Sequence, residues 1–141
     1  MNVAPFQRFL IDTGAHYALV SPRDERHQVA VRIQARAIRE RSQLLTTNFI
    51  VAESHALILN RMNRATAEAF LTGIYTSTGM TVIRVSEADE QRARDIIRQY
   101  SDKSFSFTDA TSFAVMDRLG LAYAFAFDHN FEQYGKTLLA P

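Results

Sequence analysis

Residues 108–128 read TDATSFAVMDRLGLAYAFAFD and predict a capped helix followed by a buried strand. Thr108 suits the N-cap of a helix over Asp109–Leu119, and Gly120 suits the position just after a helix end. The run Tyr123–Phe127 carries no charge, which is typical of a parallel strand covered on both faces. Asp128 follows this strand directly. A helix that leads into such a strand favours an α/β fold.

Strand-like and helix-like segments alternate along the rest of the chain. Further strands are expected at Phe6–Ile11, Leu44–Thr46, Met80–Val85 and Thr137–Leu139. Helices are expected from Pro22 to about Arg41, over Phe49–Asn60 with Thr47 or Asn48 as the cap, over Thr66–Tyr75, and from Ser86 to Tyr100. Gly14 predicts a tight turn after the first strand. The alternation predicts a three-layer α/β/α arrangement with a mainly parallel central sheet, in a single domain over residues 1–141.

The composition is that of an ordinary folded protein. Hydrophobic residues make up 47% of the 141 positions and charged residues 22%, which argues against disorder. No apolar run approaches the roughly 20 residues that cross a bilayer, and Arg8 and Asp12 interrupt the segment where a signal peptide would be apolar. The absence of cysteine excludes disulfides, zinc–thiolate sites and thiol catalysis. We therefore expect a cytoplasmic protein that does not bind a membrane.

Four carboxylates fall where strands are expected to end or helices to begin, namely Asp12, Glu53, Asp109 and Asp128. In an open α/β sheet, ligands bind beside the carboxyl ends of the strands. Acids gathered there without obvious basic partners repel each other and resist the loss of water. A divalent cation is the simplest means of keeping them ionised together. The pattern therefore predicts a metal site.

Each acid alone has an ordinary structural explanation, as a helix cap, a turn former or the partner of an arginine. Glu53 fits such an explanation least well, because Phe49, Ile50 and Leu57 lie three or four residues away on the same helical face. A carboxylate on a face that packs against the core costs free energy unless something compensates its charge. The four acids together therefore carry more weight than any one of them.

Other chemistries find less support in the sequence. Asp12-Thr13-Gly14 matches the catalytic tripeptide of retroviral-type aspartic proteases, but those enzymes are rich in strands, whereas about five capped helices are expected here. The histidines, at positions 16, 27, 55 and 129, lack the spacing of zinc ligands. Neither a G-x-S-x-G elbow nor a glycine-rich phosphate loop occurs.

The order and surroundings of the four acids resemble those of PIN-domain nucleases, especially the VapC-type toxins of toxin–antitoxin pairs. The matching segments are Phe9–Ala15, Thr46–Glu53, Phe107–Met116 and Ala126–Phe131, and they span essentially the whole chain. The resemblance implies a PIN-like fold and a metal-dependent endoribonuclease, the toxin of a type II toxin–antitoxin system. Its implied partners are an RNA substrate, a cognate antitoxin and a second copy of the chain in a homodimer.

The resemblance also implies roles for individual residues. Asp12, Glu53 and Asp109 would be the primary ligands of Mg²⁺ or Mn²⁺, with Asp128 holding a second ion or its water. Many relatives carry another acid two residues after the fourth, where this chain has Asn130, which would offer a neutral oxygen. A basic rim must contribute to RNA binding, and three arginines that share one helical face are candidates for it: Arg32, Arg36 and Arg39.

Two alternatives stay open at this stage. A structure-specific DNA nuclease of the flap type would use the same metal chemistry, although such enzymes are usually longer and carry inserted arches. A non-catalytic α/β binding module would use the acids only as caps. Divalent-ion titration of thermal stability separates the module from either nuclease, and a comparison of RNA with DNA as substrate separates the two nucleases.

Overall fold

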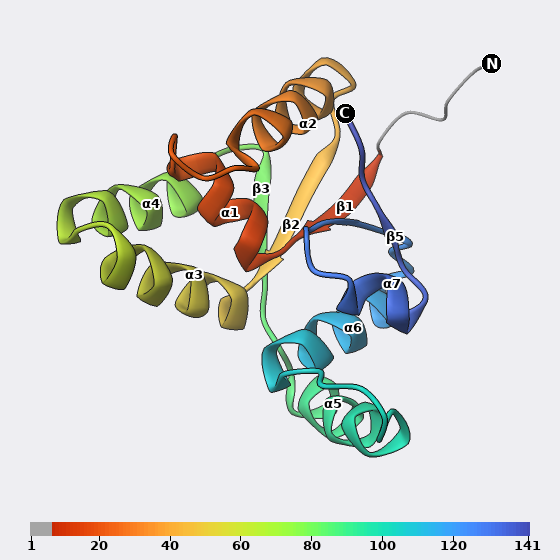
Figure 1. Ribbon diagram of the computed structural model, residues 1–141. Helices are drawn as coiled ribbons and strands as arrows, with labels where there is room; N and C mark the ends of the chain where they lie inside the picture. Colours follow the sequence, from red (N-terminus) through yellow and green to blue (C-terminus); the bar gives the residue numbers. More distant parts are fainter. Residues whose placement is uncertain (1–6) are drawn as a thin grey trace.

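A parallel five-stranded sheet forms the centre of the protein. The computed structural model describes residues 7–141, so Phe6, the first residue of the first expected strand, lies outside the described residues. The sheet has the strand order β3-β2-β1-β4-β5, and every neighbouring pair is parallel (Figure 1). Its strands are β1 (Arg8–Ile11), β2 (Gln43–Thr47), β3 (Met80–Ile83), β4 (Tyr123–Phe125) and β5 (Thr137–Leu138). The predicted parallel sheet is confirmed.

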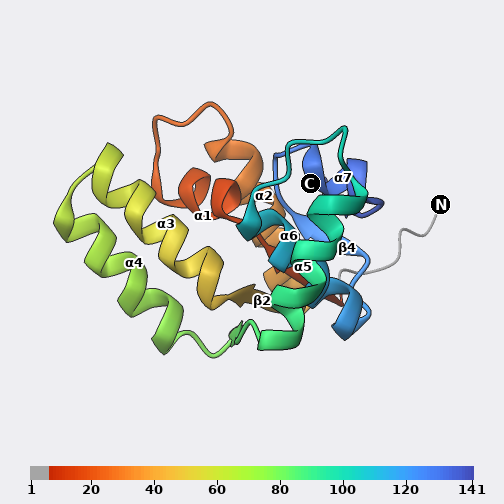
Figure 2. The ribbon, with the colours of Figure 1, turned by 90° about the horizontal axis from the view of Figure 1, so that it is seen from below.

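Helices cover both faces of this sheet, as the three-layer prediction requires (Figures 1 and 2). The helices are α1 (Thr13–Val20), α2 (His27–Arg39), α3 (Asn48–Arg61), α4 (Arg64–Thr76), α5 (Glu87–Gln99), α6 (Phe107–Leu119) and α7 (Asn130–Tyr134). The core residues of α1 and α2 lie on one face, and those of α5, α6 and α7 on the other. Within residues 7–141, none of these helices has the length and apolar character needed to span a membrane.

Strand β1 shows how the sheet divides the core. Phe9 and Ile11 pack among the residues of α1 and α2, whereas Leu10 points to the opposite side and packs among those of α5 and α6. All three side chains are fully buried. Alternate residues of a strand point to opposite faces, so a central strand covered on both sides must be apolar throughout. A polar residue fits better at the end of such a strand, where Asp12 stands.

The first crossover differs from the prediction. A helix was expected from Pro22 to about Arg41, after a tight turn at Gly14, but α1 begins at Thr13 and α2 begins only at His27. The extended backbone of Asp12 starts α1 directly, because its carbonyl accepts bonds from the backbone N–H groups of the third and fourth residues that follow. Residues 21–26 form a connection in which Asp24 Oδ1 accepts the backbone N–H of Arg26 at 2.8 Å. This local turn competes with a helix at the expected capping sequence.

The N-caps of α3 and α5 are those expected, and the N-cap of α6 differs by two residues. Thr47 caps α3 and Ser86 forms a capping box with Asp89 at the start of α5. The cap of α6 is Ser106 rather than the expected Thr108, so that Asp109 is the third residue of the helix and completes a capping box. Gly120 ends this helix with φ +68°, a backbone conformation that favours glycine. The short helix α7 was not predicted.

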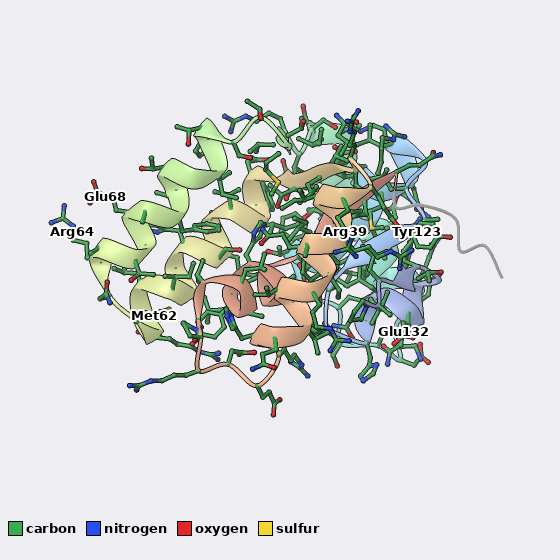
Figure 3. The ribbon with its side chains drawn as sticks, turned by 90° about the horizontal axis from the view of Figure 1, so that it is seen from above. Arg39, Met62, Arg64, Glu68, Tyr123 and Glu132 are labelled. Atoms are coloured by element: carbon green, nitrogen blue, oxygen red, sulfur yellow. The ribbon has the colours of Figure 1, made fainter. Side chains whose placement is uncertain are left out.

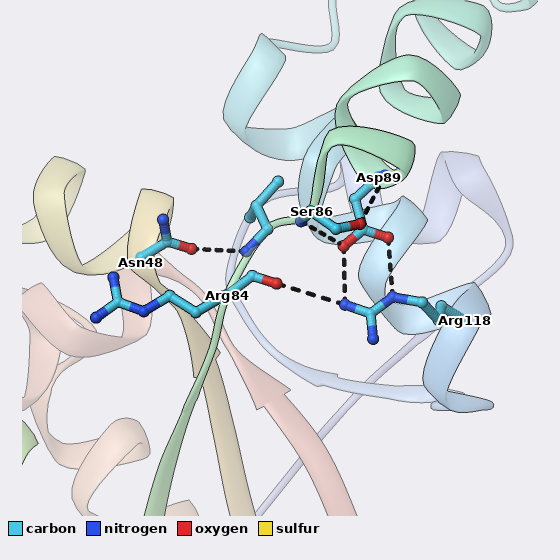
Figure 4. Close-up of polar contacts among 6 residues, drawn as sticks. Asn48, Arg84, Ser86, Asp89 and Arg118 are labelled. Atoms are coloured by element: carbon cyan, nitrogen blue, oxygen red, sulfur yellow. Dashed lines mark hydrogen bonds and ion pairs between the residues drawn. The ribbon is translucent and has the colours of Figure 1, made fainter.

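An ion pair ties the two helices α5 and α6 together beside the sheet (Figure 4). Arg118 on α6 donates through Nε and Nη2 to the carboxylate of Asp89, which is buried on α5, at 2.9 and 2.8 Å. The fork of Arg118 holds the pKa of Asp89 below its usual value, against the opposing effect of burial. Nearby, Asn48 at the start of α3 accepts the backbone N–H of Val85 at 2.8 Å. These contacts fix the approach to α5 and hence the position of α6.

Candidate active site

One cavity at the carboxyl edge of the sheet contains all four predicted acids. Its volume is about 630 Å³, and its lining includes Asp12, Glu53, Asp109 and Asp128. The acids come from four elements: Asp12 follows β1, Glu53 lies in the second turn of α3, Asp109 lies in the first turn of α6, and Asp128 follows β4. Helix α3 contacts both α1 and α6 at this edge (Figure 2). The parallel topology therefore gathers residues that are up to 116 positions apart in the sequence.

Asp12 is the most unusual carboxylate in the cavity. It is 6% exposed, and its Oδ1 atom has no hydrogen-bond partner among the described residues. Burial raises the pKa of Asp12 to about 7, opposed by a backbone hydrogen bond from Thr13, and the charges of Asp109, Glu53 and Asp128 raise it further. The neighbouring hydroxyl of Thr13 is also buried, and it too lacks a partner within residues 7–141. A buried acid of this kind needs a positive charge to stay ionised.

Asp109 is buried too, but its carboxylate is held in place. Its Oδ2 atom accepts the backbone N–H of Ser106 at 3.1 Å and the side-chain amide of Asn130 at 3.0 Å. Burial raises the pKa of Asp109, and the hydrogen bonds from Ser106 and Asn130 only partly oppose this rise. The capping box thus serves two purposes, because it begins α6 and also fixes one oxygen of an acid in the cavity.

Asn130 joins two of the acids. Its side-chain nitrogen lies 3.0 Å from Oδ2 of Asp109 and 3.4 Å from Oδ2 of Asp128, and its backbone N–H donates to Oδ1 of Asp128 at 2.9 Å. The sequence suggested that Asn130 would offer a neutral oxygen to a metal. In the structure it instead presents donors to the carboxylates. It lowers their mutual repulsion without adding charge.

Glu53 lines the cavity for a reason other than the one predicted. Its helical face was expected to be buried, whereas Glu53 itself is exposed and Phe49 and Leu57 are only half-buried. The buried face of α3 is formed by Ile50, Val51, Ser54 and Ile58. Helix α3 packs against α1 and α4 through part of this face, which turns Glu53 toward the cavity. The carboxylate is therefore accessible to a ligand, and folding does not have to remove it from water.

His16, four residues after Asp12 on α1, has a structural role. It is 3% exposed, and burial lowers its pKa to about 3, so the ring is neutral. The hydroxyl of Thr46 donates to the carbonyl of Ile11 at 3.1 Å, so the ring nitrogen Nε2 of His16 donates to that hydroxyl at 3.2 Å. The ring also packs edge-on against Phe70. His16 thus joins α1 to β2 through a buried hydrogen bond.

Arg26 is the functional candidate that the sequence did not reveal. It lines the same cavity as the acids, and its guanidinium carbon lies 5.3 Å from the centre of the Phe127 ring. In the sequence it fell inside an expected helix, 101 positions from the aromatic residue that it contacts. Although Arg26 lines the cavity, none of the four acids there forms an ion pair with any residue in 7–141.

The three arginines proposed from their spacing as a basic rim lie on α2, outside the lining of the cavity. Helix α2 begins at His27, directly after the cavity-lining Arg26, and extends over 13 residues, a length of roughly 20 Å. Arg36 forms an ion pair with Glu40 at 3.0 Å near the far end of α2. Arg39 is the last residue of α2 and is labelled in Figure 3, which views the molecule from the side opposite to Figure 2. Neither these two residues nor Arg32 lines the cavity.

The residues of the cavity fit a hard divalent cation in chemical type. Carboxylate oxygens are the ligands that Mg²⁺ and Mn²⁺ prefer, and Oδ1 of Asp12 is a buried oxygen with no hydrogen-bond partner within residues 7–141. In the same residues, no three aspartate, glutamate or histidine side chains stand close enough together to hold an ion. The acids therefore surround a space rather than a single point, and binding an ion would require side-chain movement.

Comparison with known proteins agrees with this geometry. The family model of the PIN domain matches residues 9–137. The chain belongs to the PIN domain family. It is 32% identical over 131 residues to the 23S rRNA-specific endonuclease VapC20 of Mycobacterium tuberculosis, covering 93% of this chain and 97% of that protein. It is also 32% identical over 114 residues to a VapC ribonuclease of Archaeoglobus fulgidus, covering 79% and 72%.

Two solved structures show the same architecture. The crystal structure of M. tuberculosis VapC20, described as a Sarcin-Ricin loop cleaving toxin, superposes with a TM-score of 0.86 at 32% identity and covers 94% of this chain and 99% of that one. FitAcB from Neisseria gonorrhoeae superposes with a TM-score of 0.67 at 17% identity, over 94% and 97% of the two chains, and shows likeness of fold alone. The PIN-like fold implied by the four acidic motifs is thereby confirmed.

Proposed function

We propose that this protein is a metal-dependent endoribonuclease that uses Asp12, Glu53, Asp109 and Asp128 with Mg²⁺ or Mn²⁺ as its cofactor. The observation that carries the proposal is the buried carboxylate of Asp12, whose Oδ1 has no partner within residues 7–141 and which shares a cavity with three other acids. Two relatives with 32% identity are named for RNA cleavage, which supports RNA as the substrate class.

The protein's own groups would organise this reaction. When bound, a divalent cation supplies activation of water and neutralisation of the charge that develops on the phosphate. Ser106 and Asn130 hold one oxygen of Asp109, which leaves its Oδ1 available as a ligand. Burial of Asp12 keeps water away from that carboxylate, so its attraction for a cation is stronger than at the surface. Glu53 and Asp128 are exposed and can move toward the substrate side of the cavity.

The first prediction concerns the reaction itself. Purified protein with Mg²⁺ or Mn²⁺ is expected to cleave RNA, and EDTA is expected to stop the cleavage. Gel electrophoresis of RNA and of single-stranded and flap DNA, incubated side by side, checks the result. Cleavage that continues undiminished in EDTA would exclude the metal mechanism. Preference for DNA would favour the flap-type nuclease. A melting temperature that does not change when divalent ions are added would favour the binding module.

The choice of RNA follows from the relatives. A relative that matches 93% of this chain is named as specific for 23S rRNA, and its crystal structure is described as that of a toxin that cleaves the sarcin–ricin loop. We therefore propose ribosomal RNA as the substrate to offer first. A transcript of that loop and a scrambled transcript of the same length form a matched pair. Equal cleavage of the two would show that this chain does not share the specificity of that relative.

The second prediction concerns partners. We further propose a homodimeric toxin that acts in the cytoplasm and is neutralised by a small antitoxin, which could place a cationic side chain among the acids. Expression of the chain alone is expected to stop bacterial growth, and co-expression of the adjoining reading frame is expected to restore it. Growth curves with the Asp109→Ala variant provide the control. Arrest that persists in this variant would show that catalysis does not cause the toxicity.

A further inference from the structure

The lining of the acid-lined cavity also includes the cationic side chain of Arg26. Arg26 lies in the connection before α2 and lines the cavity, although the acids there come from other elements. Its side chain is exposed and forms no ion pair with any residue in 7–141. The guanidinium therefore keeps its hydrogen-bond donors available to a ligand.

Phe127 contacts this guanidinium, and hydrogen bonds anchor the chain at Arg26 and at the next residue. Phe127 presents its ring at 5.3 Å from the guanidinium carbon, and this ring in turn packs edge-on against the fully buried Phe125. The backbone N–H of Arg26 is held by Asp24 at 2.8 Å. The next residue, His27, donates its ring Nδ1–H to the carbonyl of Ala18 in α1 at 2.7 Å. An arginine held over an aromatic face gives up less conformational freedom when it binds an anion.

The electrostatics of the cavity give such an arginine a specific task. A phosphodiester chain carries one negative charge per nucleotide and must enter a space lined by four carboxylates. A metal ion at the acids offsets only the charge next to it, because exposed charges are screened within about 8–10 Å. A guanidinium on another wall of the same cavity can bind a second phosphate through two parallel hydrogen bonds. Lysine could supply the charge but not this fork.

We propose that Arg26, positioned by Phe127, binds a phosphate of the RNA strand within the acid-lined cavity and so sets the register of the strand against Asp12 and Asp109. This inference rests on the proposed ribonuclease function. It makes Arg26 a substrate-binding residue and Phe127 a positioning residue. The two are far apart in the sequence and meet only because β4 lies beside β1 in the sheet.

The test compares Arg26→Gln with a matched control, Arg23→Gln. Arg23 is exposed in the same connection but does not line the cavity, so both variants lose one positive charge from the same segment. Fluorescence anisotropy with a labelled single-stranded RNA in EDTA measures binding apart from catalysis. Arg26→Gln is expected to weaken binding about tenfold and to reduce the slope of log affinity against log salt by about 0.7, as the loss of one phosphate contact requires. Arg23→Gln is expected to match the wild type.

Two further variants separate the effect of the bidentate geometry of the Arg26 guanidinium from the effect of its positive charge. Arg26→Lys is expected to keep the salt slope of the wild type but to bind RNA more weakly, because it retains the charge and loses the bidentate geometry. Phe127→Leu is expected to behave in the same way, since it leaves Arg26 in place without its aromatic support. In cleavage assays, the KM of Arg26→Gln is expected to rise more than its kcat falls.

The outcomes separate this inference from the proposed function. A wild-type protein that cleaves RNA while Arg26→Gln binds and cleaves equally well would overturn only the role of Arg26. A wild-type protein that neither binds nor cleaves RNA would overturn the proposed function. If Arg26→Gln lowers the melting temperature in EDTA and leaves RNA binding unchanged, the guanidinium serves to offset the charge of the acids, and the inference is wrong.

Discussion

Asp12→Asn is expected to abolish RNA cleavage while leaving the metal-free protein as stable as the wild type or more stable. The substitution keeps the shape of the side chain and removes its charge, so the ligand set of the cavity loses its most buried acid. It also removes a source of repulsion among the four carboxylates, and functional sites often trade stability for activity in this way. Asp12 stands at the N-cap position of α1 but makes no side-chain capping bond, so little capping free energy is lost.

The same residue predicts a pH dependence for the metal-free protein. The pKa of Asp12 is raised from 3.8 to about 7, so between these values the folded state binds more protons than the unfolded state. The free energy of unfolding in EDTA is therefore expected to fall as the pH rises from about 4 to about 7, and to level off above that, by an amount on the order of a few kcal/mol. Asp12→Asn is expected to flatten this decline without removing it, because burial also raises the pKa of Asp109.

Denaturant titrations of the two proteins in EDTA at pH 5 and pH 8 check both statements. At pH 8 the variant is expected to match or exceed the wild type, and at pH 5 the two are expected to differ less. Addition of Mg²⁺ at pH 8 is expected to stabilise the wild type and not the variant, because a ligand stabilises only the state that binds it. A large loss of stability in the variant, together with intact cleavage, would make Asp12 a structural residue.

The four acids could be located from the sequence because the fold places them by simple rules. Apolar runs such as Tyr123–Phe127 are typical of a parallel strand covered on both faces, and an acid that follows such a strand is expected at the carboxyl edge of the sheet. The capping sequence before α6 placed Asp109 at the start of that helix in the same way, although the cap is Ser106 rather than Thr108. An error of two residues did not matter, since Asp109 falls in the first turn of the helix under either assignment.

The features that the sequence did not reveal depend on packing between distant elements. The burial of Val51 and Ser54 rather than Phe49 and Leu57 depends on where α1 and α4 pack against α3, and helical spacing alone does not contain that choice. A tight turn was expected in place of α1 because Gly14 is a typical turn residue. The position of Arg26 depends on where α1 ends and where α2 begins, because Arg26 lies in the connection between these two helices.

Asp109→Asn and Asp128→Asn are expected to fail in different ways, because the two acids are held differently. Asp109 is buried, and one of its oxygens is fixed by Ser106 and Asn130. Asp128 is exposed and bonded chiefly to the backbone and side chain of Asn130. We expect Asp109→Asn to remove both metal binding and turnover. We expect Asp128→Asn to raise the metal concentration needed for half-maximal cleavage more than it lowers the rate at saturating metal.

The reason for this asymmetry is the charge available at each side of the cavity. Asp12, Glu53 and Asp109 can provide three carboxylates to one ion, whereas Asp128 stands beside a neutral amide where a second acid would strengthen a further site. Less negative charge offsets less of the cost of dehydrating the ion, which is severe for Mg²⁺. Asn130→Asp supplies the missing charge and serves as the matched variant, so it is expected to lower the metal requirement.

Calorimetric titration with Mn²⁺ in the absence of RNA measures this difference directly. The wild type is expected to bind one ion tightly and a second weakly, and Asn130→Asp is expected to strengthen only the weaker step. A crystal grown with Mn²⁺ and no RNA then places the ions, with the tight one expected between Asp12 and Asp109. Two ions at full occupancy in that crystal would contradict the asymmetry. A tight ion held by Asp128 alone would show that the exposed acid, rather than the buried pair, dominates metal binding.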